Sequence, residues 1–271
     1  MAEIFGILNI TEDSFSDGGR FLNPEQAIAQ GTKLLQEGAD WLDISGQSSN
    51  ISAKLVSEAE EWNRIEPVIR HFVPLGVRLS VDSFRPYVQK KALDAGVQCI
   101  NDITGFSYDD DRSFLKEHFS KKQTSKLVVM HSHNKGIAKE NSRLTEANVI
   151  QEILVFFRDR RSELMSLGIP ESAIYFDPGM GFFLSDNPMV SFKVLQDLST
   201  LLLEFPNMMV GVSRKSFLGK TLGGISVEER EFASLACEIH LLQIKIPWIR
   251  THHVLKLRQA EKILGLCQNL R

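Results

Sequence analysis

Short apolar runs alternate with longer amphipathic stretches along the whole chain. Each apolar run has the length and near-continuous hydrophobicity typical of a strand buried on both faces of a parallel sheet. The pattern predicts eight strands, at residues 4–10, 41–45, 77–82, 99–102, 127–130, 174–177, 208–212 and 248–251.

The stretches between these runs have helical spacing, and residues typical of helix starts and ends flank several of them. Asn23-Pro24 starts the first stretch, and Gly38, Gly96 and Gly168 follow predicted helix ends. The spacing predicts helices at residues 24–37, 57–72, 86–95, 110–119, 147–167, 187–203, 227–243 and 253–268.

Eight strand-then-helix units in a chain of 271 residues predict a (β/α)8 TIM barrel. No linker or shift in composition divides the chain, so residues 1–271 are predicted to form a single domain. An open doubly wound sheet is the alternative. It typically has fewer strands and a GxGxxG turn, and that motif is absent from the sequence.

Charge and cysteine content exclude several classes of partner. The net charge is −3 and no long Lys/Arg run occurs, which argues against nucleic acid or a membrane surface as partner. Three scattered cysteines, Cys99, Cys237 and Cys267, form neither a disulfide framework nor a zinc pattern. No stretch has the roughly 18 apolar residues of a membrane span, and no secretion signal is evident. We therefore expect a cytoplasmic protein.

Polar residues end most of the predicted strands, where a (β/α)8 barrel carries its active site. A single carboxylate there has a plainer explanation: Asp82 precedes Pro86 and is suited to cap the next helix. We expect Asp102 to be structural, because it lies on the strand face opposite to Asn101. The recurrence of polar ends nevertheless favours a binding site, formed by Asn9, Asp43, Ser45, Asp82, Asn101, His131, Asp177, Ser213, Lys215, Arg250 and His252.

The residue types at these ends suggest a ligand with two unlike parts. Asp82, Asn101 and Asp177 suit a planar ring edge with adjacent N–H donors, and Lys215 can donate to a ring carbonyl or nitrogen. Arg250 and His252 follow the eighth strand, where such barrels commonly hold phosphate. We therefore expect an acidic end that binds a heteroaromatic head and a cationic end that binds a phosphate tail.

Eight sequence blocks, in order along the chain, resemble the dihydropteroate synthase family. The first and seventh blocks are the most specific. They are GILNITEDSFSDGG (6–19), GADWLDISG (38–46), LSVDSFRP (79–86), INDITG (100–105), VVMH (128–131), FDPGMGF (176–182), VGVSRKSFLG (210–219) and IRTHHV (249–254). The resemblance implies an enzyme of folate biosynthesis that joins 4-aminobenzoate to 6-hydroxymethyl-7,8-dihydropterin diphosphate and releases diphosphate.

The resemblance also implies residue roles. Asp82, Asn101, Asp177 and Lys215 would hold the pterin, with Met130 and Phe182 against its ring. Asn9 would help to bind the diphosphate through Mg²⁺, and Arg250 and His252 would contact it directly. The residues near the aminobenzoate would be Phe15, Ser49, Ser213 and Arg214. Lys215, Asp82, Arg250 and His252 are the expected catalytic residues, and the family forms homodimers through helices near the carboxyl end.

The sequence departs from the family pattern at three places. After the second strand the family carries Gly-Glu-Ser-Thr-Arg-Pro-Gly, but here Asn50 and Ile51 replace the arginine and the proline. His253 replaces an aspartate, and we expect it to add positive charge. The lysine that follows Gly-Phe-Gly in the family is missing after Phe182. The pterin residues are therefore intact, whereas the loops expected to bind diphosphate and aminobenzoate are altered.

Three other functions remain as alternatives. A catalytically impaired or altered-substrate pterin-binding homologue would keep the pocket and lose the loop chemistry. A pterin-dependent methyltransferase would keep the acidic pocket but has no use for the SRKS segment. A metal hydrolase could use His131, His133, His252 and His253, because the HxH pattern suits zinc.

The departure at Asn50 and Ile51 predicts a slow enzyme. Negative charge grows on the leaving diphosphate in the transition state, so a missing cation should lower turnover as well as affinity. We expect the double change Asn50→Arg with Ile51→Pro to raise dihydropteroate formation by on the order of tenfold, the effect of one charged hydrogen bond. A product assay checks this, with pterin affinity expected to stay unchanged. Unchanged turnover in the double variant would contradict the explanation.

Overall fold

Eight parallel strands form one sheet that curves into a barrel. The computed structural model describes residues 1–11, 23–47, 55–109, 111–121, 124–133 and 142–269. The strands are β1 (Glu3–Asn9), β2 (Trp41–Ser45), β3 (Leu79–Asp82), β4 (Cys99–Asp102), β5 (Lys126–Met130), β6 (Ile174–Asp177), β7 (Met209–Val210) and β8 (Trp248–Thr251). Their order is β6-β5-β4-β3-β2-β1-β8-β7, and a parallel bridge between Phe176 and Met208 joins β6 to the segment before β7. The predicted (β/α)8 barrel is confirmed.

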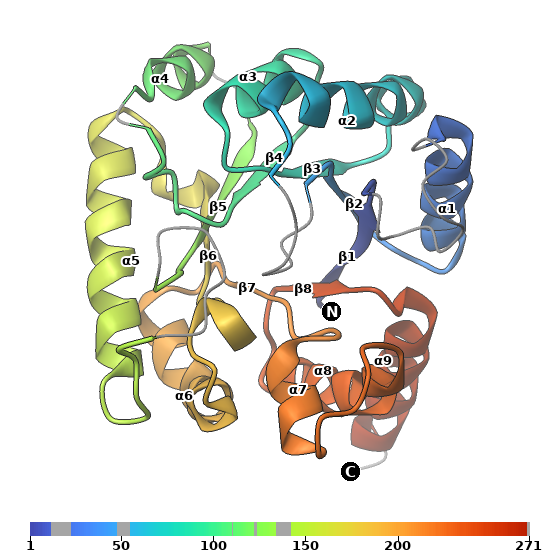
Figure 1. The fold of residues 1–271 in the computed structure, drawn as a ribbon, viewed down its shortest axis with the longest axis vertical. Helices are drawn as coiled ribbons and strands as arrows, with labels where there is room; N and C mark the ends of the chain where they lie inside the picture. Colours follow the sequence, from blue (N-terminus) through green and yellow to red (C-terminus); the bar gives the residue numbers. More distant parts are fainter. Residues whose placement is uncertain (12–22, 48–54, 110, 122–123, 134–141, 270–271) are drawn as a thin grey trace.

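Helices surround the strands on the outside of the barrel (Figure 1). They are α1 (Pro24–Gln36), α2 (Glu58–Phe72), α3 (Pro86–Asp94), α4 (Ser113–Ser120), α5 (Val149–Ser166), α6 (Pro188–Glu204), α7 (Ser216–Thr221), α8 (Glu231–Gln243) and α9 (Val254–Asn269). The prediction missed α7, because a six-residue helix that contains Gly219 is too short to show helical periodicity. Otherwise the predicted elements agree with the structure to within a few residues at most ends.

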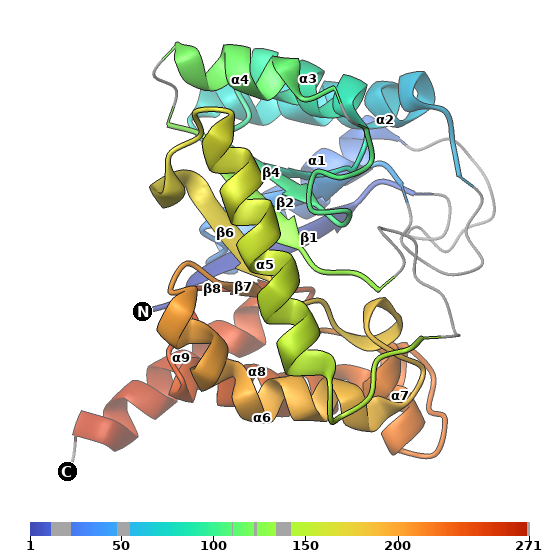
Figure 2. The same cartoon turned by 90° about the vertical axis from the view of Figure 1, so that its left-hand side faces the viewer.

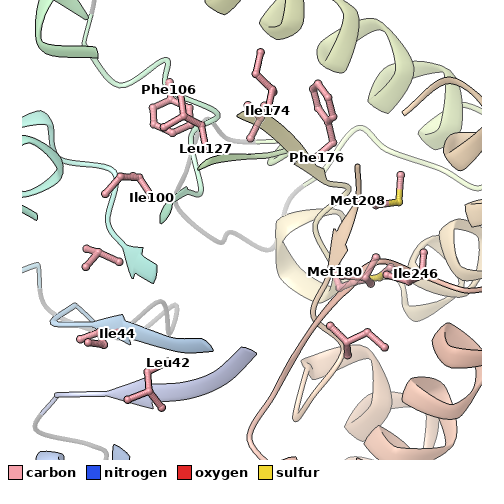
Figure 3. Close-up of a cluster of buried hydrophobic side chains, with 14 of the residues drawn as sticks. Leu42, Ile44, Ile100, Phe106, Leu127, Ile174, Phe176, Met180, Met208 and Ile246 are labelled. Carbon is pink, nitrogen blue, oxygen red and sulfur yellow. The ribbon is translucent and has the colours of Figure 1, made fainter. Parts of the chain in front are cut away.

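The outward face of the strands packs against the helices. Ile174 and Phe176 of β6 point toward α5 (Figure 3), where the Phe176 and Phe157 ring centres lie 4.8 Å apart. Leu42 and Ile44 of β2 and Ile100 of β4 are fully buried in the same cluster. This layer is the main hydrophobic core, and it holds the barrel inside its shell of helices.

The inward face carries a second, aromatic layer. The Phe5 ring centre lies 5.1 Å from that of Trp41 and 4.7 Å from that of Trp248. Tyr175 of β6 stacks on Trp248 of β8, with ring centres 3.5 Å apart. Cys99 is buried in the same interior cluster. The layer therefore fills the barrel where its strands begin and forms the floor beneath the polar residues that follow.

Asp102 faces outward, as predicted. Its Oδ2 accepts a hydrogen bond from Gln89 Nε2 of α3 at 2.6 Å, and its Oδ1 accepts from the backbone N–H and hydroxyl of Thr104 at 2.6 Å each. These bonds attach the end of β4 to α3 and to the turn that follows. Asn101 consequently points into the barrel.

Two further observations concern the whole chain. All three cysteines are free thiols, with Cys99 buried and Cys267 exposed. Within the ranges that the structure describes, no helix is long and apolar enough to cross a membrane.

Glu238 of α8 provides a test of the packing between helix and barrel. It is fully buried, and burial raises its pKa from 4.5 to about 8, although the Thr251 hydroxyl offsets part of the effect. Between these pH values the folded protein keeps a proton that the unfolded chain has released. The free energy of unfolding should therefore fall with rising pH, by up to ~1.4 kcal/mol per unit from this group.

We expect Glu238→Gln to remove this contribution, because the amide does not ionise. Urea denaturation at pH 5.5 and pH 8 should show a stability gain for the variant that grows with pH. Glu152→Gln, on the exposed face of α5, serves as the control and should follow the parent. A pH dependence in Glu238→Gln equal to that of the parent would contradict the assignment.

Candidate active site

The polar residues of the barrel interior stand directly above the aromatic layer. Successive inward residues on a strand are two positions apart, so each residue of the buried floor is followed by one at the next level. The pairs are Trp41 and Asp43, Cys99 and Asn101, Val128 and Met130, Tyr175 and Asp177, and Trp248 and Arg250. This periodicity brings the predicted residues of five strands into one mouth at the carboxyl end of the barrel.

Arg250 crosses the interior from β8 to two carboxylates. Its Nη2 donates to Oδ2 of Asp82 on β3 at 2.6 Å and forms an ion pair with Asp43 on β2. Burial disfavours the charge of the guanidinium, but Asp43, Asp82 and Asp177 more than compensate and raise its pKa. The predicted separation into an acidic and a cationic end is therefore wrong in detail, since Arg250 lies among the carboxylates.

The Arg250 pair also decides between the two interpretations of Asp82. Helix α3 has Arg85 at its N-cap and no side-chain cap hydrogen bond, so Asp82 does not cap it. Burial raises the pKa of Asp82, and the charge of Arg250 opposes this effect. Asp82 thus belongs to the interior of the barrel.

Asp177 ends β6 with one carboxylate oxygen engaged. Its Oδ1 accepts from the backbone N–H of Gly179 at 2.8 Å, and burial raises its pKa to about 6. Gly179 has a φ of +72°, and a Cβ there would lie 2.3 Å from the carbonyl oxygen of His131. The FDPG sequence therefore makes a turn that only glycine permits, and it leaves Oδ2 of Asp177 for another partner.

Asn101 is a buried amide that needs a partner. It is fully buried, and neither its Oδ1 nor its Nδ2 has a hydrogen-bond partner among the described residues. It pairs in register with Asp82 on the neighbouring strand. Because buried amides are almost always hydrogen-bonded, this side chain indicates a ligand that offers both a donor and an acceptor.

Lys215 enters the mouth from the turn after β7. Its ammonium lies 4.8 Å from the centre of the Phe183 ring. Burial and the charge of Arg250 lower the pKa of Lys215 to about 8, although Asp177 and Asp82 favour its charged form. The Lys215 ammonium of the SRKS segment thus lies beside an aromatic ring, and the carboxylates of the site favour its charged form.

His252 and Ser213 form a pair at the ends of β8 and β7. Ser213 Oγ accepts from the His252 backbone N–H at 3.2 Å and lies 3.1 Å from its Nδ1. Burial and neighbouring cations lower the pKa of His252 well below its usual range. His252 is therefore a neutral hydrogen-bonding group rather than a cation.

His253 does not supply the expected positive charge. Its Nε2 accepts from Nε of Arg214 at 3.3 Å, and burial and the charge of Arg214 lower its pKa. An imidazole that accepts a hydrogen bond from an arginine is neutral. His253 instead orients the Arg214 side chain.

Met130 and Phe182 lie in one apolar cluster, together with Ile103 and Phe183. Sequence reasoning named the first two and missed the others. Ile103 lies within the INDITG block and Phe183 directly follows the FDPGMGF block, and these positions are the signal that could have indicated them. The cluster provides an apolar surface for a planar ring beside the polar groups.

The remaining predicted residues have mixed outcomes. Asn9 ends β1 opposite Ser45 of β2 and is partly exposed. Phe15 and Ser49 lie outside the described residues, as do Asn50 and Ile51. Phe15 and Ser49 keep only the roles that the resemblance implies, and the effect of Asn50 and Ile51 stays a prediction.

The metal-hydrolase alternative has no support in the site. Nowhere in the described ranges does a group of three or more His, Cys, Asp or Glu residues stand close enough to hold a metal ion. His131 packs edge-on against Phe156, with ring centres 5.2 Å apart, and burial lowers its pKa to about 4. His131 is thus a neutral packing residue.

Comparisons with known proteins agree with this geometry. The family model of pterin binding enzymes matches residues 5–252. Dihydropteroate synthase type-3 of Escherichia coli is 39% identical, over 97% of this chain and 98% of that protein. Dihydropteroate synthase type-2 of Escherichia coli is 41% identical, over 97% of this chain and 94% of that protein.

Solved structures show the same relationship. Xanthomonas albilineans dihydropteroate synthase with 4-aminobenzoic acid superposes with a TM-score of 0.86 at 32% identity, covering 98% of this chain and 93% of that one. The same enzyme in complex with 7,8-dihydropteroate superposes with a TM-score of 0.82 at 30% identity, covering 98% of this chain and 94% of that one. The chain therefore belongs to the pterin-binding enzyme family, among the dihydropteroate synthases.

Proposed function

We propose that the protein condenses 6-hydroxymethyl-7,8-dihydropterin diphosphate with 4-aminobenzoate, giving 7,8-dihydropteroate and diphosphate for folate biosynthesis. The observation that carries the assignment of the site is Asn101, a fully buried amide without a partner among the described residues. It stands at one level of the barrel with Asp82 and Asp177. Together they present acceptors and a donor to one flat ligand.

The pterin head fits this set of groups. Its ring edge carries adjacent N–H donors for Oδ2 of Asp177 and for Asn101, and its ring carbonyl can accept from Lys215. Met130 and Phe182 would lie against the ring. Arg250 retains a buried Nε–H without a partner in the described part of the chain, and this donor can reach the ligand.

The reaction breaks one bond and forms another at the same carbon. The electrons of the carbon–oxygen bond leave with the diphosphate, so the pterin methylene becomes positive and the leaving group more negative. Carboxylates near the ring stabilise the first charge, and Lys215, Arg250 and a hydrogen bond from His252 stabilise the second. The amine lone pair of aminobenzoate then forms the carbon–nitrogen bond, and the amine releases a proton to solvent.

The second substrate needs positioning more than it needs a base. We place 4-aminobenzoate beside Ser213 and Arg214, whose guanidinium is oriented by His253. Phe15 and Ser49 are proposed for the same subsite from the resemblance alone. The relative from Xanthomonas albilineans that was solved with 4-aminobenzoic acid supports a substrate of this class.

Magnesium fits the site only as a partner of the substrate. Asn9 offers a single amide oxygen at the end of β1, and Mg²⁺ is commonly bound by one or two protein oxygens together with phosphates and water. Bound there, the ion would neutralise negative charge on the diphosphate. Asn9 would orient the diphosphate toward Arg250 and His252.

We also propose a cytoplasmic homodimer. Phe232 of α8 is 81% exposed, and Leu255, Ile263 and Leu266 of α9 are each about half exposed. Exposed apolar side chains on neighbouring helices favour a subunit contact. Sedimentation equilibrium measures the oligomeric state directly.

The pterin pocket is tested by Asp177→Asn. The amide can still accept from Gly179 but loses the charge, so 6-hydroxymethylpterin should bind more weakly by about 2–4 kcal/mol. Asp102→Asn, a buried carboxylate on the outward face of a strand, is the control and should leave pterin affinity unchanged. Isothermal titration measures both.

Two results would change the assignment. Equal pterin affinity in Asp177→Asn and the parent would show that the pocket is placed wrongly. Tight pterin binding by a parent that forms no dihydropteroate would favour the non-catalytic pterin-binding homologue.

The pH profile provides an independent test. Asp177 must be ionised to accept two N–H groups, and its pKa is raised to about 6. Lys215 must be protonated to donate, and its pKa is lowered to about 8. We therefore expect kcat/KM for the pterin substrate to be highest between these values and to fall on both sides. A flat profile from pH 5 to pH 9 would exclude both groups from binding.

A further inference from the structure

The turn between β7 and α7 contains an unfavourable backbone conformation. Arg214 has a φ of +60°, in the left-handed region that non-glycine residues rarely adopt. It stands between Ser213 and Lys215, two proposed substrate-binding residues. Such a conformation persists only when surrounding contacts hold it.

Arg230, which directly precedes α8, and Ser234 in its first turn hold the Arg214 backbone. Its N–H donates to Ser234 Oγ at 2.9 Å, and its carbonyl accepts from Arg230 Nη1 at 3.0 Å. Ser234 is fully buried, and its hydroxyl donates to the Arg230 carbonyl at 2.7 Å. The backbone N–H and carbonyl of Arg214 are thus both hydrogen-bonded to the side chains of two residues, Ser234 and Arg230, that are themselves connected by a hydrogen bond.

The Arg230 guanidinium is itself held against α7. Its Nη2 donates to the Ile225 carbonyl at 3.1 Å. Its plane covers Gly219, where a Cβ would lie 2.4 Å from Nε and 2.7 Å from Cζ. Gly219 is not among the residues with positive φ, so its backbone does not require glycine. The space taken by the guanidinium explains the last residue of VGVSRKSFLG.

We propose that Arg230, seated on Gly219, is a positioning residue that locks the turn at Arg214 and thereby sets the place of Lys215 in the site. This inference rests on the proposed function, because Lys215 is taken there to bind the pterin substrate. Neither Arg230 nor Gly219 is among the proposed substrate-binding residues. Their effect is transmitted through the backbone of one residue.

Relaxation of the turn would move Lys215. If Arg214 returns to a common φ, the chain direction after it changes, and the Lys215 ammonium shifts relative to Asp177 and the Phe183 ring. A misplacement of about 1 Å in a reactive site can cost on the order of 100-fold in rate. Loss of this lock, the contacts of Arg230 with Gly219 and with the Arg214 carbonyl, should therefore affect catalysis more than stability.

Arg258 of α9 offers a matched control. Its Nε donates to the Gly38 carbonyl at 2.9 Å, and a Cβ on Gly38 would lie 3.3 Å from the Arg258 side chain. It is thus another arginine that covers a glycine and binds a backbone carbonyl. It contacts the segments before β1 and β2, and Figure 2 shows the amino terminus and α7 at opposite ends of the barrel. Its loss should destabilise the fold without reaching the site.

The experiment compares Arg230→Ala, Arg230→Lys, Gly219→Ala and Arg258→Ala at equal folded concentration. We expect kcat/KM to fall roughly ten- to 100-fold in Arg230→Ala and Gly219→Ala, and to change by less than about twofold in Arg258→Ala. Arg230→Lys should be intermediate, because an ammonium reaches one of the two carbonyls but not both. If Arg230→Ala does not fold, Gly219→Ala and Arg230→Lys provide the test.

The double variant Gly219→Ala with Arg230→Ala separates the lock from ordinary helix effects. With the guanidinium gone, alanine at position 219 meets no obstacle and is the better helix former. We therefore expect the second change to cause no further loss of kcat/KM in that background. Equal losses from Gly219→Ala in both backgrounds, or normal kcat/KM in folded Arg230→Ala, would overturn the proposal.

A readout independent of turnover distinguishes failure of the lock from failure of the proposed function. The pH dependence of Lys215 acylation by an amine-reactive reagent, mapped by mass spectrometry, should have a midpoint near pH 8 in the parent. The midpoint should rise in Arg230→Ala and Gly219→Ala as Lys215 gains solvent, and stay in place in Arg258→Ala. A parent without synthase activity that still shows this pattern would refute the function alone. Unshifted midpoints would refute the lock.

Discussion

The buried ion pairs of Arg250 are the interaction on which the site depends. A guanidinium inside a barrel is unfavourable unless carboxylates surround it, and here Asp43 and Asp82 do so from two other strands. Burial favours the neutral acid form of Asp82, but the charge of Arg250 favours the ionised carboxylate. Removing Arg250 would leave both carboxylates in the interior without this cation.

The aromatic floor makes this arrangement possible. Phe5, Trp41, Tyr175 and Trp248 fill the barrel where its strands begin, so water cannot reach the polar layer from below. Burial in the layer above disfavours the charged forms of Lys215 and Asp177, which is why the pKa of Lys215 is lowered and that of Asp177 is raised. The shifts move both pKa values toward neutral pH.

Glycines have two distinct functions around the mouth. Gly179 is required by its backbone, because its φ is positive and the His131 carbonyl occupies the place of a side chain. Gly219 is required only by space, because the Arg230 guanidinium lies over it. The family motifs FDPGMGF and VGVSRKSFLG each contain one of them. A motif position can thus be restricted by a neighbour that the motif does not include.

The sequence by itself determined the barrel and the polar residues that line its mouth. Eight buried runs with polar ends lead to this architecture, because carboxyl ends of parallel strands meet on one rim and residues two apart share a face. The outward direction of Asp102 and the inward direction of Asn101 followed from the same alternation. These features are local and periodic, so they can be inferred without knowing which segments meet.

Only the tertiary structure decided which charges are paired. Arg250 lies 168 positions from Asp82 in the chain, and Arg214 binds His253 across 39 positions. Sequence alone therefore predicts a cationic end at Arg250 and an added charge at His253, and it leaves Asp82 an equal claim to be a helix cap. The contact of Arg230 with Gly219 was missed for the same reason. Charge state and hydrogen bonding depend on burial and on distant partners, and chain folding alone brings those together.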